Sequence, residues 1–151
     1  METASDVTPF RQEARLRVFS LFGFRKSSNV PNLFLRGTLE GRVTDAIVLD
    51  AYASAARYVA SHGPCRGITD ISKVTKFEVS SSAIRELAQR TPVIPTGYMR
   101  VIVAPQDFRY GMMRMFQILS EKTRPDLHVV RTMDEAYQLL QVESPEFSPI
   151  G

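Results

Sequence analysis

The clearest fold signal in the chain is YMRVIVAPQDFRYGMMRMFQIL, the stretch at residues 98–119. Its first part, residues 98–104, carries the β-branched run of a buried strand. Pro105 closes that strand, Asp107 is placed to cap a helix, and apolar side chains then recur at helical spacing, at Phe108, Met112, Met115, Phe116 and Leu119. The stretch therefore predicts one strand followed by one amphipathic helix.

A similar strand and helix come earlier in the chain. Residues 33–39 predict a strand that ends in a polar turn at residues 40–42. Thr44 can cap the helix that follows, whose apolar stripe consists of Ile47, Val48, Ala51, Tyr52, Ala55, Tyr58 and Val59. The sequence His62-Gly63-Pro64 ends this helix by the usual order of glycine and then proline.

Two further units complete the pattern. Residues 65–71 predict a strand that leads through residues 72–77 to a helix capped by a serine of the run at 80–82 and ended before Pro92. Residues 127–130 predict the last strand, and Thr132 with Glu135 has the form of a capping box. Four such units in series predict a single α/β domain with a mostly parallel sheet of four to five strands and about four helices.

This domain is expected to cover residues 30–142, with an arm before it at residues 1–29 and a proline-rich tail after it at residues 143–151. Two structures are open for the arm. Apolar residues at Phe10, Ala14, Val18, Leu21 and Phe22 favour a helix. The alternation of Leu16, Val18, Ser20 and Phe22 favours a strand that pairs antiparallel with residues 33–39, with residues 25–32 as the connection.

Composition and charge exclude several classes of protein. The chain has 151 residues, 44% of them hydrophobic, and a net charge of +3. Residues 11–26 alone carry +4, so the body is nearly neutral and nucleic acid is not an expected partner. No apolar run is long enough to span a bilayer, and Cys65 has no second cysteine to pair with. We therefore expect a cytoplasmic protein.

Three stretches carry a resemblance to a known family. Asp70-Ile71-Ser72-Lys73-Val74-Thr75, leading to Ser80-Ser81-Ser82-Ala83-Ile84, resembles the motif of STAS domains in anti-sigma-factor antagonists, which are SpoIIAA-like proteins. Residues 107–114 and 130–136 are similar to a less characterised bacterial branch of SpoIIAA-like proteins. The resemblance covers about residues 30–142. It implies a regulatory module without enzymatic activity that works by protein contact.

The resemblance also implies a site of phosphorylation, because a partner kinase that is also the anti-sigma factor modifies a serine of this motif. The candidates are Ser80, Ser81 and Ser82. Counting from Asp70 places the modified position at Val79, whereas alignment on Ile84 places it at Ser81. A phosphate at this helix start would be stabilised by the helix dipole, and helix capping alone is the alternative role for these serines.

A second group of candidate residues follows the predicted strands, at the edge where ligands bind in open α/β sheets. The residues are Asp70, Ser72, Asp107, Tyr110 and Arg114. Tyr110 and Arg114 share a helix face, and an ion pair between Asp70 and Arg114 is expected. This group predicts a cleft for a ligand or partner, and a structural salt bridge between two loops is the alternative.

Three functions remain open. The first is a signalling module whose contact surface is residues 72–85 with residues 105–114, and whose partner is a kinase or anti-sigma-like protein. The second is a carrier or sensor of a small apolar ligand, because lipid-carrier folds of the CRAL-TRIO type have a related sheet arrangement. A helix rich in methionine, with Met112, Met113 and Met115, and the Phe147-bearing tail would enclose its cavity, although core packing also explains these methionines.

The third function is a hydrolase that uses Asp70 or Asp107, for which the chain offers no catalytic motif. We expect no catalytic residue, no cofactor and no metal, since His62 and Cys65 lack further ligands of the kind that zinc requires. A homodimer, formed through the arm or an exposed sheet edge, is compatible with all three functions.

Overall fold

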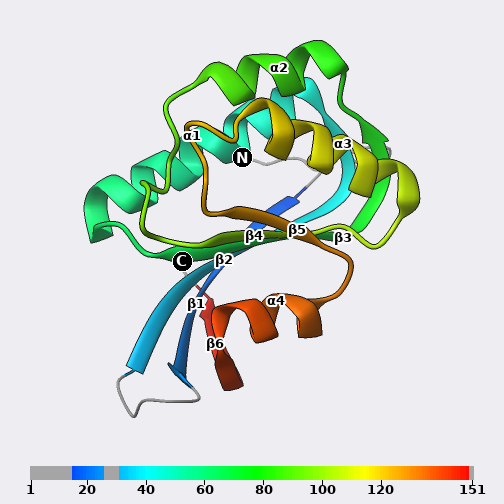
Figure 1. The fold of residues 1–151 in the computed structure, drawn as a ribbon. Helices are drawn as coiled ribbons and strands as arrows, with labels where there is room; N and C mark the ends of the chain where they lie inside the picture. Colours follow the sequence, from blue (N-terminus) through cyan, green and yellow to red (C-terminus); the bar gives the residue numbers. More distant parts are fainter. Residues whose placement is uncertain (1–14, 26–30, 150–151) are drawn as a thin grey trace, which may run out of the picture.

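The computed structural model describes residues 15–25 and 31–149, and the side chains of residues 35–142. Its strands form one six-stranded sheet in the order β5-β4-β3-β2-β1-β6 (Figure 1). The strands are β1 (Arg15–Arg25), β2 (Pro31–Thr44), β3 (Arg66–Glu78), β4 (Arg100–Val103), β5 (Leu127–Val130) and β6 (Val142–Pro149). The helices are α1 (Asp45–His62), α2 (Ser81–Gln89), α3 (Asp107–Leu119) and α4 (Met133–Leu140).

The predicted α/β class is confirmed. Strands β2, β3, β4 and β5 are parallel to one another, and each of the four is followed by one helix, as the four sequence units predict. Strand β1 adds to β2 in the antiparallel direction, and β6 adds to β1 in the same way. The proline-rich tail therefore becomes an edge strand, which makes the sheet one strand wider than the upper limit we expected.

The described part of the arm is a strand and not a helix. Leu16 pairs with Leu39 and Phe22 pairs with Leu33, so the expected antiparallel pairing with residues 33–39 is confirmed. A strand is favoured here because β1 has a hydrogen-bonding partner on each side, β2 and β6. Residues 1–14 and the connection at residues 26–30 lie outside the described residues.

Two predicted strand ends are wrong. Residues 40–42 are not a turn, because β2 continues to Thr44, and residues 72–77 belong to β3, which continues to Glu78. The β2–β3 register shifts between Thr38 and Glu40 and again between Gly41 and Arg42. Such irregularities let the ladder continue past a bend, and Gly41 supplies the positive φ of 83° that one of them needs.

The predicted helix starts hold at three of four positions. Thr44, Ser80 and Thr132 are the N-caps of α1, α2 and α4, and the capping box with Glu135 is complete. Asp107 is not the cap of α3, because Gln106 occupies that position and Asp107 lies in the first turn. The Asp107 carboxylate instead accepts a hydrogen bond from Arg131.

The helices form two unequal layers. Helices α1, α2 and α3 cover one face of the sheet, and α4 covers the other (Figure 1). The larger core lies under α2 and α3, where Ile84, Leu87 and Phe116 meet Ile71 and Ile102 of the sheet. The smaller core lies under α4 and contains Ile68, Val101, Val103, Ala136, Leu140 and Val142. Strands β3 and β4 are therefore buried on both faces.

Candidate functional site

Helix α1 covers the sheet without burying any of its own residues. Its apolar stripe is half-buried throughout, including Val48, Ala51, Tyr52, Ala55 and Tyr58. An amphipathic helix normally buries such a stripe against the core. Here all five of these side chains line a cavity between α1 and the sheet, and Val48, Ala51 and Tyr52 also pack against the larger core.

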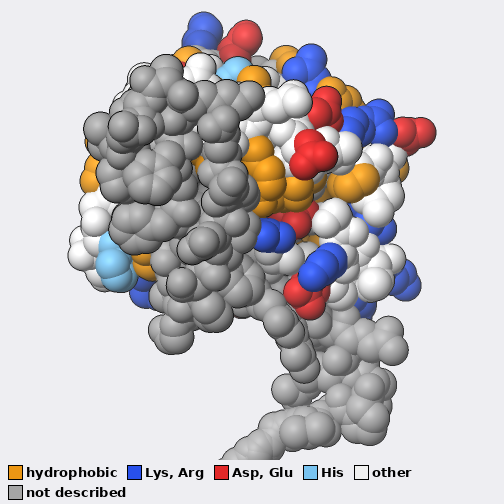
Figure 2. All heavy atoms as spheres, turned by 90° about the horizontal axis from the view of Figure 1, so that it is seen from below, with side chains coloured by type: hydrophobic (Ala, Val, Ile, Leu, Met, Phe, Trp, Pro, Cys, Tyr) orange, Lys and Arg blue, Asp and Glu red, His pale blue; other side chains and the backbone are white. Residues whose placement is uncertain are grey.

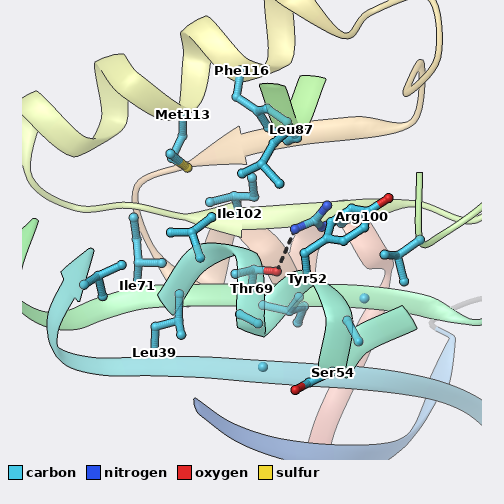
Figure 3. Close-up of a pocket in the computed structure, with 18 of the residues that line it drawn as sticks. Leu39, Tyr52, Ser54, Thr69, Ile71, Leu87, Arg100, Ile102, Met113 and Phe116 are labelled. Atoms are coloured by element: carbon cyan, nitrogen blue, oxygen red, sulfur yellow. Dashed lines mark hydrogen bonds between the residues drawn. The ribbon is translucent and has the colours of Figure 1, made fainter. Parts of the chain in front are cut away.

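The cavity has a volume of about 150 Å³ and an almost wholly apolar wall. Strand residues Leu39, Ile71 and Ile102 form part of its floor. Leu87 of α2 and Met113 and Phe116 of α3 close one side, and Figure 3 shows these side chains pointing into the same space. Every helix on this face of the sheet thus contributes to the wall.

A single charged side chain, Arg100, lies in this apolar wall among the described residues. Its Nη2 atom donates to Thr69 Oγ1 at 3.4 Å, the dashed contact in Figure 3. Burial lowers the pKa of Arg100 to about 10, and the positive charge of Arg124 contributes to the same shift. The guanidinium remains cationic at neutral pH because that value is still well above 7.

Tyr52 and Ile94 complete the wall near Arg100. The Tyr52 hydroxyl donates to the carbonyl oxygen of Thr91, which ties α1 to the segment after α2. Ile94, from the same segment, lines the main cavity and also a smaller one of about 20 Å³. Arg100 lines both cavities, so it stands between the apolar space and a second, more polar hollow.

Asp70 lies at the predicted sheet edge but on the side of α4. It is 2% exposed, and its carboxylate accepts from Arg36 Nη2 at 3.3 Å and from the Ser72 backbone at 2.9 Å. The expected ion pair between Asp70 and Arg114 is wrong, because α3 packs on the opposite face of the sheet. The Arg114 side chain instead donates to Gln117 Oε1 on its own helix.

Asp107 and Tyr110 meet a residue that we did not predict, Arg131. Arg131 Nη1 donates to Asp107 Oδ1 at 2.6 Å and to the Pro105 carbonyl oxygen, and its guanidinium lies 4.1 Å from the centre of the Tyr110 ring. This exposed cluster joins the loops that follow β4 and β5. None of the predicted cleft residues, Asp70, Ser72, Asp107, Tyr110 or Arg114, lines either cavity described above.

The three candidate serines differ in their contacts. Ser80 Oγ accepts from the Ala83 backbone at 3.1 Å and donates to Asp45 Oδ2 at 2.8 Å, so it caps α2 and joins it to the start of α1. Ser81 and Ser82 are exposed in the first turn of α2. Of the three, Ser80 therefore has a structural role, and Ser81 and Ser82 have hydroxyls open to solvent.

The sequence identified part of the cavity wall and missed its polar end. The methionine-rich helix does contribute Met113, whereas the side chains of the tail, whose backbone forms β6, lie outside the described residues. Arg100 and Thr69 were missed. The sequence did contain a signal for Arg100, which stands between Met99 and the apolar run that begins at Val101. Burying a charge in such an apolar stretch is unfavourable, so an arginine there points to a functional or structural role.

Surface charge on the α4 side is mixed. Figure 2, viewed from that side, shows Lys and Arg side chains interspersed with Asp and Glu side chains and a patch of hydrophobic side chains beside them. The visible described surface therefore carries no field of one sign. Within the described residues, no helix is both long enough and apolar enough to cross a membrane, and no three His, Cys, Asp or Glu side chains cluster as metal ligands.

The geometry defines an α/β protein with an internal apolar cavity that has one cationic end. Comparison with known proteins adds no relative to this description: no family model, no curated protein and no solved structure matches the chain. The candidate site therefore rests on the cavity and its wall.

Proposed function

We propose that this chain binds a small apolar molecule in the cavity under α1, as a carrier or sensor of that molecule. The observation that carries the proposal is the cavity itself, which has an apolar wall built from α1, α2, α3 and the sheet. Ligand sites are typically concave and apolar, with a few polar groups that fix orientation, and this cavity has that character.

The energetics favour an occupant. Apolar surface that a ligand covers in this cavity is removed from water, which is favourable by about 25 cal/mol per Å². An engineered apolar cavity of similar volume in another protein binds benzene. A small apolar ligand would recover contacts for α1, whose residues are all incompletely buried. The carboxylates considered for a hydrolase, Asp70 and Asp107, lie outside the cavity wall.

The test is a calorimetric titration with 1-octanol, an uncharged apolar probe. Ala51 lines the cavity, so Ala51→Leu fills part of the space, and we expect this variant to lose most of the octanol affinity of the wild type. The matched control is Ala53→Leu, two residues along the same helix on its exposed side. It should bind octanol as the wild type does.

The two variants should also differ in stability. Filling the cavity with Ala51→Leu should raise the unfolding temperature of the free protein, whereas Ala53→Leu adds an exposed leucine and should leave it nearly unchanged. Absence of octanol binding to the wild type, measured with correctly folded protein, would contradict the proposed function. Equal binding to both variants would place the ligand outside the cavity.

A second candidate function, a protein-contact module of the STAS type, is supported by a different observation. Phe108 is 67% exposed at the start of α3 and contacts Phe77 edge to face, within the surface expected from residues 72–85 and 105–114. Exposed Ser81 lies in the same expected surface. A large exposed aromatic is characteristic of a contact residue.

The test of this second function measures the affinity for a partner captured from lysate. Phe108→Ser should abolish capture and Ser81→Asp should weaken it, whereas Lys122→Asp, on an exposed residue outside the surface, should not. Retention of the same partner by Phe108→Ser would argue against this surface. If Ser81→Asp kept the affinity of the wild type, the result would argue against a phosphorylation switch at Ser81 but not against the contact surface.

A further inference from the structure

Arg100 is the feature of the cavity that an uncharged ligand leaves unexplained. It is the first residue of β4 and pairs with Gly67 of β3, which places it at the beginning of the parallel strands. Figure 3 shows its guanidinium next to Tyr52 and Thr69, with Leu39, Ile71 and Met113 farther along the cavity. The cavity thus has a cationic end and an apolar end.

The positive charge of Arg100 has no carboxylate partner among the described side chains. A guanidinium has five N–H donors, and the hydrogen bond to Thr69 Oγ1, at a long 3.4 Å, engages one of its nitrogens. Asp126 lines the smaller cavity with Arg100, but its carboxylate accepts from the Gly97 backbone at 2.7 Å. A half-buried cation without a counter-charge is only partly solvated, so Arg100 is available to bind an anion.

The neighbouring cation, Arg124, is already engaged. Its Nη atoms donate to the carbonyl oxygens of Leu87, Ala88 and Arg90 at 3.1 to 3.2 Å. One guanidinium therefore remains for an anion, and this favours a head group with one negative charge over a doubly charged phosphate. A carboxylate has the planar geometry that a guanidinium binds through two hydrogen bonds.

We propose that the ligand is an apolar monocarboxylate whose carboxylate pairs with Arg100 and whose hydrocarbon part lies between Leu39, Ile71 and Met113. This inference rests on the proposed function, since it assigns the chemistry of the ligand in the same cavity. A cavity of similar volume in another protein holds benzene, so about six carbons fit inside, and the partly open side of this cavity lets a longer chain extend. Octanoate is a suitable probe.

The experiment compares octanoate with 1-octanol at neutral pH, because the two share a chain and differ in charge. We expect the wild type to bind octanoate about tenfold or more tightly than octanol, the effect of charge-assisted hydrogen bonds. Arg100→Met removes the cation and keeps a long apolar side chain. This variant should lose the preference for octanoate and keep its affinity for octanol.

Lys122→Met is the control, because it removes one positive charge from an exposed position away from the cavity. It should retain the preference for octanoate. Equal affinity of the wild type for octanoate and octanol would overturn the inference and leave the proposed function standing. Binding of neither probe would remove the proposed function as well. The wild-type comparison decides the question even if Arg100→Met fails to fold.

Discussion

Asp70 and Asp107 are associated with neighbouring strands, and their surroundings differ in burial. Asp70 is 2% exposed and accepts from Arg36 and from the Ser72 backbone, whereas the Asp107 side chain, paired with Arg131, is 95% exposed. We expect Asp70→Asn to lower the free energy of unfolding by about 2 to 4 kcal/mol, because it breaks an ion pair whose carboxylate is buried. Urea unfolding followed by circular dichroism measures the change.

The matched substitution Asp107→Asn removes a shorter ion pair, at 2.6 Å, yet it should cause no measurable loss of stability. Solvent screens an exposed pair, and ordering two mobile side chains offsets most of the attraction. A larger loss for Asp107→Asn than for Asp70→Asn would show that bond length outweighs burial in this protein.

Cys65 gives a prediction about pH. Burial raises the pKa of its thiol above the ordinary value of 9.0. The folded state therefore keeps the thiol proton at pH values where the unfolded chain has lost it, and the free energy of unfolding should fall as pH rises above about 9. Cys65→Ala should show a smaller fall over the same range of pH in urea unfolding. An identical pH dependence in both proteins would contradict this.

At the scale of one element, the C-terminal end of helix α2 is capped by Arg124, a residue far away in sequence. Arg124 donates to three carbonyl oxygens at or just after the last turn of α2, where a helix has no partners of its own. Arg124→Met should lower the free energy of unfolding by about 2 to 4 kcal/mol, because buried carbonyl groups lose their donors. Arg85→Met, on the exposed side of the same helix, is the control.

The helix caps show what local sequence can predict. Thr44, Thr132 and one serine of the run 80–82 were predicted as helix caps, because each cap bond joins residues only three apart in sequence. The C-terminal contacts of α2 were not predicted, since Arg124 lies far from Leu87 in sequence and only the packing of the chain brings them together. The ends of β2 and β3 were missed for the same reason, because pairing between strands extends both past polar residues.

In the candidate site too, local sequence predicts some features, and others depend on how the chain packs. The apolar stripe of α1 and the methionines of α3 follow from helical spacing alone. That the stripe faces a cavity depends on how far α1 stands from the sheet, and Arg100 enters the cavity because β4 pairs with β3 at Gly67. Neither the distance between a helix and a sheet nor the pairing of strands that lie far apart in sequence follows from the residues of one element.

At the scale of the whole molecule, α1 should open more readily than the central strands β3 and β4. Strands β3 and β4 contain residues that are fully buried, including Ile68, Val101 and Ile102, whereas α1 contains none. Local opening costs least where few apolar groups are buried. We expect amide hydrogen exchange to be faster over residues 45–62 than over residues 66–72, measured by mass spectrometry.

The same exchange measurement with bound ligand gives a second prediction. Octanoate in the cavity should slow exchange over residues 45–62 and change residues 133–140 little, since α4 covers the opposite face of the sheet (Figure 1) and none of its residues lines the cavity. Exchange over α1 that is as slow as in β3 without ligand would contradict the idea of a loosely held helix.

The pairing of β1 with β6 has a consequence for how the protein is made. Residues 19–25 are hydrogen-bonded to residues 142–149, so the partner of an early strand is a late one. A ribosome releases the chain from its N-terminal end, and β1 must wait with one edge open while the four parallel units emerge and fold. During that interval the open edge can pair with another nascent copy, and the arrival of β6 ends the exposure.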